Sequence, residues 1–127
     1  MLSAREYIDI TITKRLNKQK PTDITVNDDE YNRIVSDLNN LISKTSRENK
    51  IPGFTPEDLQ SFFYMQIHQS IRRCKYDPDK PAFPYFVRAF RNLLADIVRM
   101  RNNCVKNNLT TDPLDECAFW IENDKML

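Results

Sequence analysis

Residues 86–98 read FVRAFRNLLADIV, and this stretch carries the strongest periodicity in the chain. Its apolar residues recur three and four positions apart: Phe86, Val87, Phe90, Leu93, Leu94, Ile97 and Val98. This spacing predicts an apolar stripe on a helix that starts near Pro84 and runs to about Arg101 or beyond. Alternation of period two, which would predict strands, is found only over residues 8–12, inside another predicted helix.

Further helices are predicted on both sides of this one, separated by breaks rich in Pro, Asn and Asp. The clearest follows Thr55, a capping residue with Pro56 and two acidic residues after it, and runs to about Arg73. The others are predicted over Ser3–Gln19, Asp28–Arg47 (capped by Asn27 or Asp28) and Pro113–Glu122. The fold class is therefore predicted to be all-α, a compact bundle of about four to five helices.

Length and composition exclude several function classes. The chain has 127 residues, of which 40% are hydrophobic and 29% charged, as expected for one folded domain. A single Gly cannot build a Gly-rich phosphate loop, and three scattered Cys with one His make a zinc site improbable. We therefore expect no cofactor, no metal ion and no enzymatic activity. The odd Cys count and the lack of a long apolar run predict a cytoplasmic protein without membrane association.

Charge is distributed unevenly although the net charge is only +1. Residues 72–106 carry nine basic and three acidic residues, whereas residues 112–127 carry five acidic and one basic. On the helix over residues 84–101, Arg88, Arg91 and Arg99 lie off the apolar stripe. Aromatic residues lie just before or at the start of this helix. Rings and guanidinium groups together suit unpaired bases and phosphates, but a solvated face above core aromatics explains them equally well. His68 is interpreted as a surface or boundary residue.

The stretch from Glu57 to Asn102 resembles the second conserved region of bacterial sigma factors. The motifs that carry the resemblance are Asp58-Leu59-Gln60, Tyr76-Asp77-Pro78, Tyr85…Ala89…Asn92 and Asp96…Arg99. The size of the chain and the spacing of its third motif are most similar to the compact late-transcription sigma factors of T4-like bacteriophages. The resemblance covers about 46 residues. It implies a segment, residues 1–54, that braces the core, a region-two-like unit over residues 55–108, and an acidic, hydrophobic tail over residues 109–127.

The resemblance also implies roles for particular residues. In sigma factors the first helix of this region docks on the clamp helices of the largest subunit of core RNA polymerase. The matching candidates here are Asp58, Leu59, Gln60, Ser61, Tyr64, Gln66 and His68. The aromatic-rich helix melts the minus-ten promoter element and holds its non-template strand. The matching candidates are Phe83, Tyr85, Phe86, Arg88, Arg91, Asn92, Arg99 and Arg101.

This sequence departs from the housekeeping sigma factors in its melting helix. Their paired Trp residues in the melting helix correspond to Arg88 and Ala89 here, so melting is expected to be weaker or to need a co-activator.

The tail of the phage factors binds the DNA sliding clamp, which implies a clamp-binding role for Leu114, Phe119, Trp120 and Ile121. A C-terminal helix packed on the core is an equally good interpretation of these four residues.

The function predicted from the sequence is transcription initiation at a minus-ten-like late promoter, in the cytoplasm of the host cell if the chain is phage-encoded. The alternative is a small helical adapter, a co-activator or an inhibitor, that binds the polymerase without promoter contacts. An unrecognised nuclease or nucleotide-binding enzyme is the weakest alternative, because the chain lacks a Gly-rich loop and a metal cluster.

Overall fold

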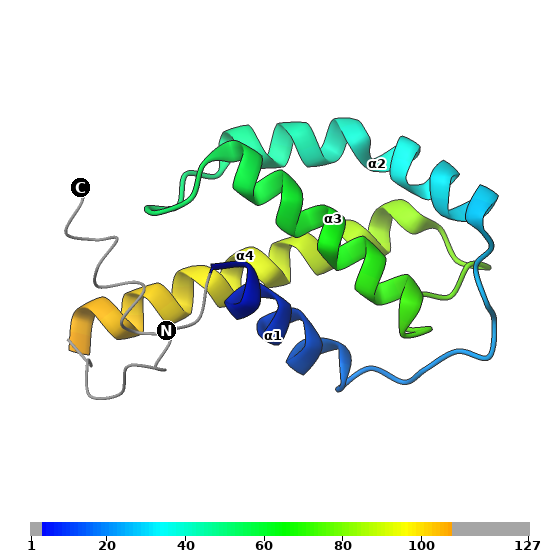
Figure 1. Cartoon of the computed structure of the whole chain (residues 1–127), viewed down its shortest axis with the longest axis horizontal. Helices are drawn as coiled ribbons and strands as arrows, with labels where there is room; N and C mark the ends of the chain where they lie inside the picture. The colour runs from blue at the N-terminus through cyan, green and yellow to red at the C-terminus, as the bar shows by residue number, and fades with distance from the viewer. Residues whose placement is uncertain (1–3, 108–127) are drawn as a thin grey trace.

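The computed structural model describes residues 4–107, and the side chains of residues 5–102, as a bundle of four helices. Helix α1 spans Ala4–Leu16, α2 spans Asp28–Glu48, α3 spans Pro56–Arg72 and α4 spans Ala82–Asn107. Helix α3 packs against the other three, and α4 runs behind it along the length of the molecule (Figure 1). The described residues contain no strand, so the predicted all-α bundle is confirmed. No described helix has the length and apolar character that crossing a membrane requires.

One hydrophobic core joins all four helices. Its largest fully buried side chains are Tyr7, Phe63, Phe86, Phe90, Ile8, Ile12, Leu16, Leu38, Ile42, Leu59 and Ile67. The rings of Phe63 and Phe90 lie 4.6 Å apart at the contact between α3 and α4. Ile8 and Ile12, in the stretch that alternates in the sequence, are both buried at a helical spacing of four. The division into a bracing segment, a region-two-like unit and a tail stays a prediction.

The helix starts follow the capping signals of the sequence. Asn27 accepts a hydrogen bond from the backbone N–H of Glu30, so Asn27 is the cap of α2. Thr55 and Asp58 form a reciprocal capping box at the start of α3. These contacts reach only three residues along the chain, which is why the sequence predicts them. The predicted start of the first helix at Ser3 and the predicted helix over residues 113–122 lie outside the described residues.

Two predicted helix ends are wrong by a few residues. Helix α1 ends at Leu16 and not at Gln19, because the N–H groups of Lys18 and Gln19 donate to carbonyls three residues back in a tightened turn. Helix α4 begins at Ala82 and not at Pro84. A proline is tolerated in the first turn because the N–H that it lacks would have no partner within the helix. At the other end α4 continues through the Asn-rich residues to Asn107.

Candidate nucleic-acid interface

A groove of about 760 Å³ lies between the end of α1 and the start of α4. Loops at residues 19–22 and 75–81 form its sides, and Gln66 of α3 lies at its base. Five of its lining residues are basic and one, Asp77, is acidic; the basic ones are Arg15, Lys20, Lys75, Lys80 and Arg88. We call this the basic groove. Its charge suits a polyanionic ligand.

The end of α3 builds one side of the basic groove. Cys74 has a φ of 54°, in the left-handed region, and its N–H donates to the carbonyl of Ile71 at 3.1 Å. The N–H of Lys75 donates to the carbonyl of Ser70 at 2.8 Å, which completes a Schellman motif. The motif turns the chain back, so that the Cys74 carbonyl accepts from the N–H of Thr22 at 2.7 Å. The two loops of the groove are therefore joined through the backbone.

The loop over residues 75–81 is held by a buried tyrosine. Tyr76 is 3% exposed, and its hydroxyl donates to the carbonyl of Lys80 at 2.7 Å. The N–H of Lys80 in turn donates to the carbonyl of Asp77 at 3.0 Å. Three prolines further restrict the backbone between residues 78 and 84. Lys80 therefore stands on a backbone that is already ordered before any ligand binds.

Tyr85 is fixed in the wall of the basic groove. Its ring centroid lies 5.2 Å from that of Tyr76 and 4.8 Å from that of Phe86. Its hydroxyl donates to Oε1 of Gln19 at 2.9 Å, with the Lys75 carbonyl at 3.4 Å as a second acceptor. Burial raises the pKa of Tyr85, against the smaller opposing effect of hydrogen bonding with Ser70 and Gln19. Burial, with the nearby Asp77 charge, also raises the pKa of Tyr76.

The basic side chains of the groove fall into two groups. Arg15 pairs with Asp96, and Nζ of Lys75 donates to the carbonyl of Gln19 at 2.8 Å. The side chains of Lys20, Lys80 and Arg88 are exposed and have no hydrogen bond or ion pair with another residue of the described range. These three cations are available to neutralise phosphate groups of a ligand.

The predicted DNA-binding residues are only partly brought together. Tyr85, Arg88 and Asn92 line the basic groove, and Arg91 is exposed nearby on α4. Phe83 is 56% exposed in the first turn of α4. Arg99 lies about three turns beyond Arg88 and is bound to Asp96 at 2.6 Å, while Arg101 is half-buried.

Phe86 is a correction to the predicted DNA-binding set. Its ring is fully buried against Tyr76, Tyr85 and Phe90, so it supports Tyr85 from below and does not reach a ligand. The apolar stripe that contains Phe86 already indicated this position, since the stripe faces the core.

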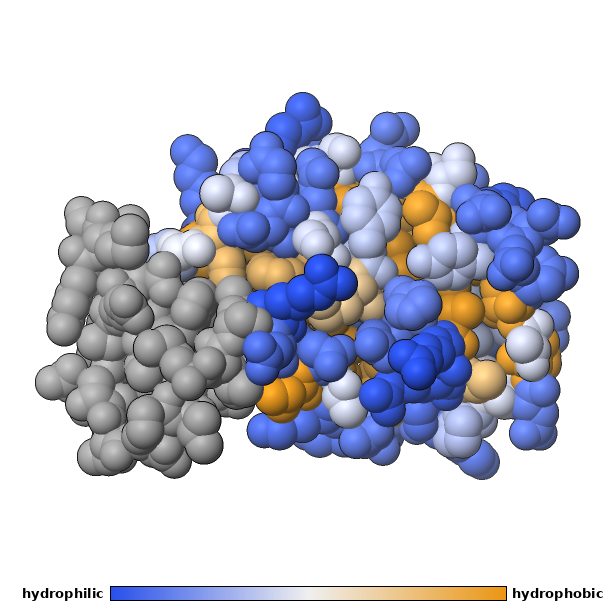
Figure 2. Space-filling model, viewed as in Figure 1, coloured by the Kyte–Doolittle hydropathy of each residue, from blue (hydrophilic) through white to orange (hydrophobic). Residues whose placement is uncertain are grey.

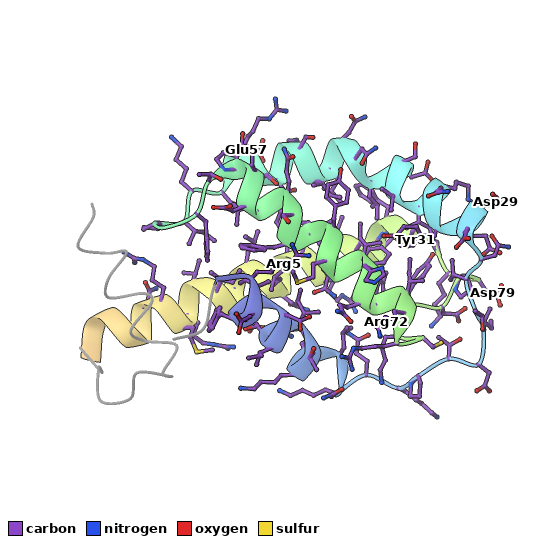
Figure 3. The ribbon with its side chains drawn as sticks, in the orientation of Figure 1. Arg5, Asp29, Tyr31, Glu57, Arg72 and Asp79 are labelled. Atoms are coloured by element: carbon purple, nitrogen blue, oxygen red, sulfur yellow. The ribbon has the colours of Figure 1, made fainter. Side chains whose placement is uncertain are left out.

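A second, more polar groove of about 540 Å³ lies between α1, α2 and α3. It contains three of the residues predicted to bind the polymerase, Ser61, Tyr64 and His68, together with Tyr31 of α2. The hydroxyl of Tyr64 donates to Oδ1 of Asn39 at 2.7 Å, and the exposed His68 meets the Tyr31 ring edge-on at 6.3 Å. Tyr31 and Arg5 mark this surface in Figure 3. We call it the polar groove; it shares no lining residue with the basic groove.

Two predicted polymerase contacts are corrected by burial. Leu59 is 1% exposed and belongs to the core. Gln66 is 3% exposed, and its Nε2 donates to Oγ of Ser70 at 2.9 Å on the side of α3 that faces the basic groove. Asp58 is engaged in the cap of α3, whereas Gln60 is half-exposed. The predicted surface is thus reduced to side chains on one face of α3.

Sequence reasoning missed the groove residues that precede α3. Arg15, Gln19 and Lys20 come from a different part of the chain than the basic stretch over residues 72–106, and no local pattern marks them. Lys75 and Lys80 lie inside that basic stretch, and its excess of positive charge was the signal that could have found them. Hydrophilic side chains cover much of the face shown in Figure 2, with apolar side chains visible between them.

The clamp-binding candidates Leu114, Phe119, Trp120 and Ile121 lie outside the described residues, so their role stays a prediction. In comparisons with known proteins, the chain matches no family model, no curated protein and no solved structure.

Proposed function

We propose that this protein is a transcription initiation factor of the sigma type, which binds core RNA polymerase and opens a minus-ten-like promoter element. The observation that carries the proposal is the basic groove, where Tyr85, Arg88 and Asn92 stand among basic residues from other segments. The resemblance of residues 57–102 to the second conserved region of sigma factors supplies the identity of the ligand.

The chemistry of the basic groove is consistent with holding an opened strand. Flipping a base out of a duplex costs a few kcal/mol, and an aromatic ring that stacks on a base returns about 1–3 kcal/mol. Lys20, Lys80 and Arg88 supply the charge that follows the phosphates. Because Tyr85 is already held by Gln19, little side-chain entropy is lost when a base meets its exposed edge.

The polar groove supports the second half of the proposal. Ser61, Tyr64 and His68 present hydrogen-bonding groups on the face of α3 that turns away from Gln66 and the basic groove. A protein that joins a polymerase to DNA needs two separate surfaces, and one helix here contributes to both.

A run-off transcription assay on a supercoiled template, with core polymerase and with or without the protein, tests the proposal. We expect discrete transcripts only when the protein is present. The double variant Arg88→Gln/Lys80→Gln should abolish promoter opening and still bind core polymerase. The control, Lys44→Gln/Arg47→Gln, removes the same charge from exposed positions on α2 and should retain activity. An absence of both transcripts and core binding would overturn the proposal.

A second candidate, the polymerase-binding adapter without promoter contacts, is favoured by one observation. The Tyr85 hydroxyl is engaged by Gln19 and its ring packs on Tyr76 and Phe86, as expected for a residue that only supports the fold. The variant pair above separates the two functions. An adapter would modify transcription equally well with and without the groove charges.

A further inference from the structure

The basic groove has a charge complement in the same chain. Five basic residues and one acidic residue line it, and three of the cations have no partner in the described part of the chain. Residues 115–124 contain four carboxylates, Asp115, Glu116, Glu122 and Asp124, and no basic residue. We propose that residues 115–124 bind in the basic groove when no other polyanion occupies it.

The length of chain after α4 permits this contact. Asn107 lies about 22 Å beyond Asn92 of the basic groove, because a helix rises about 1.5 Å per residue. Residues 108–114, if extended at about 3.4 Å per residue, span about 24 Å. Asp115 therefore reaches the groove, and the residues after it follow the groove toward α1. Lys20, Lys80 and Arg88 are the cations that receive the carboxylates.

The apolar content of the two partners also matches. The basic groove exposes Pro81, Pro84 and Tyr85 beside its cations. Between its two acidic pairs, the segment carries Phe119, Trp120 and Ile121. Contact of these side chains with the groove wall removes apolar surface from water and adds a contribution that salt does not screen.

The contact makes the tail a competitor of nucleic acid, a consequence that rests on the proposed function. A groove that is free for only a tenth of the time binds its ligand about tenfold more weakly. Binding of the tail by another protein would release the groove and restore the intrinsic affinity. The docking itself depends only on the charges and the reach given above.

Trp120 is the only Trp of the chain, so its fluorescence reports on the tail without any nucleic acid. In the full chain at low salt we expect a blue-shifted emission that is shielded from acrylamide. Three groove substitutions should shift the emission to the red and expose Trp120: Lys20→Gln, Lys80→Gln and Arg88→Gln. A control that neutralises two exposed cations of α2, Lys44→Gln/Arg47→Gln, should leave the emission unchanged. An exposed Trp120 in the wild type, or a shielded one that ignores the groove substitutions, would overturn the docking.

A second measurement tests competition, with a fluorescein-labelled single-stranded DNA of about 20 nucleotides as probe. The tail variant neutralises the four carboxylates of the full chain: Asp115→Asn, Glu116→Gln, Glu122→Gln and Asp124→Asn. It should bind the probe about tenfold more tightly than the wild type at low salt. If the groove substitutions release Trp120 but neither protein binds the probe, the docking holds and the proposed DNA site fails. Equal affinity of the two proteins for the probe would contradict competition.

Discussion

Arg15, in the last turn of α1, holds the carboxylate of Asp96 on α4 through two hydrogen bonds. Nε donates to Oδ2 at 2.8 Å and Nη2 donates to Oδ1 at 2.6 Å. Asp96 is 8% exposed, and its Oδ1 also accepts from Nη2 of Arg99 at 2.6 Å. Arg15 and Asp96 are 81 positions apart in the sequence, so this ion pair joins α1 to α4. It lies next to the basic groove, which Arg15 also lines.

The two arginines that share Asp96 should contribute unequally to stability. Arg15→Met leaves a nearly buried carboxylate without its bidentate partner and should lower the free energy of unfolding by about 2–3 kcal/mol. Arg99→Met removes a partner whose side chain is 70% exposed and should cost less than about 1 kcal/mol. Urea unfolding of both variants measures the difference. Equal losses would show that the burial of Arg15 is unimportant.

Cys74 is a position where a glycine should stabilise the protein. Its φ of 54° places a Cβ in the left-handed region, at a cost of about 1–2 kcal/mol. Cys74→Gly removes this cost and should raise the free energy of unfolding by about 0.5–1 kcal/mol, after the greater flexibility of the unfolded chain is included. Cys74→Ala keeps the Cβ and is the control, for which no gain in thermal midpoint is expected. A gain in the alanine variant would mean that the thiol and not the backbone is the source.

The predicted contact of Asp58 with the polymerase can be separated from its contribution to the cap of α3. Asp58 and Thr55 share the capping box of α3, so Asp58→Ala and Thr55→Ala should each cost about 1 kcal/mol of stability. Only Asp58→Ala removes a predicted polymerase contact. Pull-down with core polymerase should therefore weaken for Asp58→Ala and stay near the wild-type level for Thr55→Ala. If both variants bind equally, Asp58 serves the helix alone.

The tyrosines of the groove wall should make stability depend on alkaline pH. Burial raises the pKa of Tyr76 and of Tyr85 in the folded protein above the ordinary value of about 10. Above about pH 10 the unfolded chain loses these protons first, so the free energy of unfolding falls as pH rises through the folded-state pKa values. Below about pH 10 both tyrosines are protonated in the folded and in the unfolded chain, so their contribution to the free energy of unfolding is fully present. Urea unfolding from pH 8 to 11 should give a shallower fall for Tyr85→Phe than for the wild type; an identical slope would contradict the burial effect.

The helices and their caps were predictable because their causes are local. The stripe from Phe86 to Ile97, the cap at Asn27 and the box at Thr55 depend on residues within one or two turns. The same stripe placed Phe86 in the core, although the resemblance to sigma factors had assigned it to DNA. The predicted boundaries were wrong by two or three residues at the end of α1 and at the start of α4. Tertiary packing as well as helix propensity decides such boundaries.

The sequence by itself determined an all-α bundle, the faces of its helices and the presence of an exposed arginine row on α4. Only the tertiary structure decided that Arg88 lines one groove together with Lys20 and Lys80, that Gln19 holds Tyr85, and that Arg15 engages Asp96. The reason is how far apart in the sequence the interacting residues lie. Hydrogen bonds along a helix join residues four apart, whereas the groove is set by how three separated segments pack on one core.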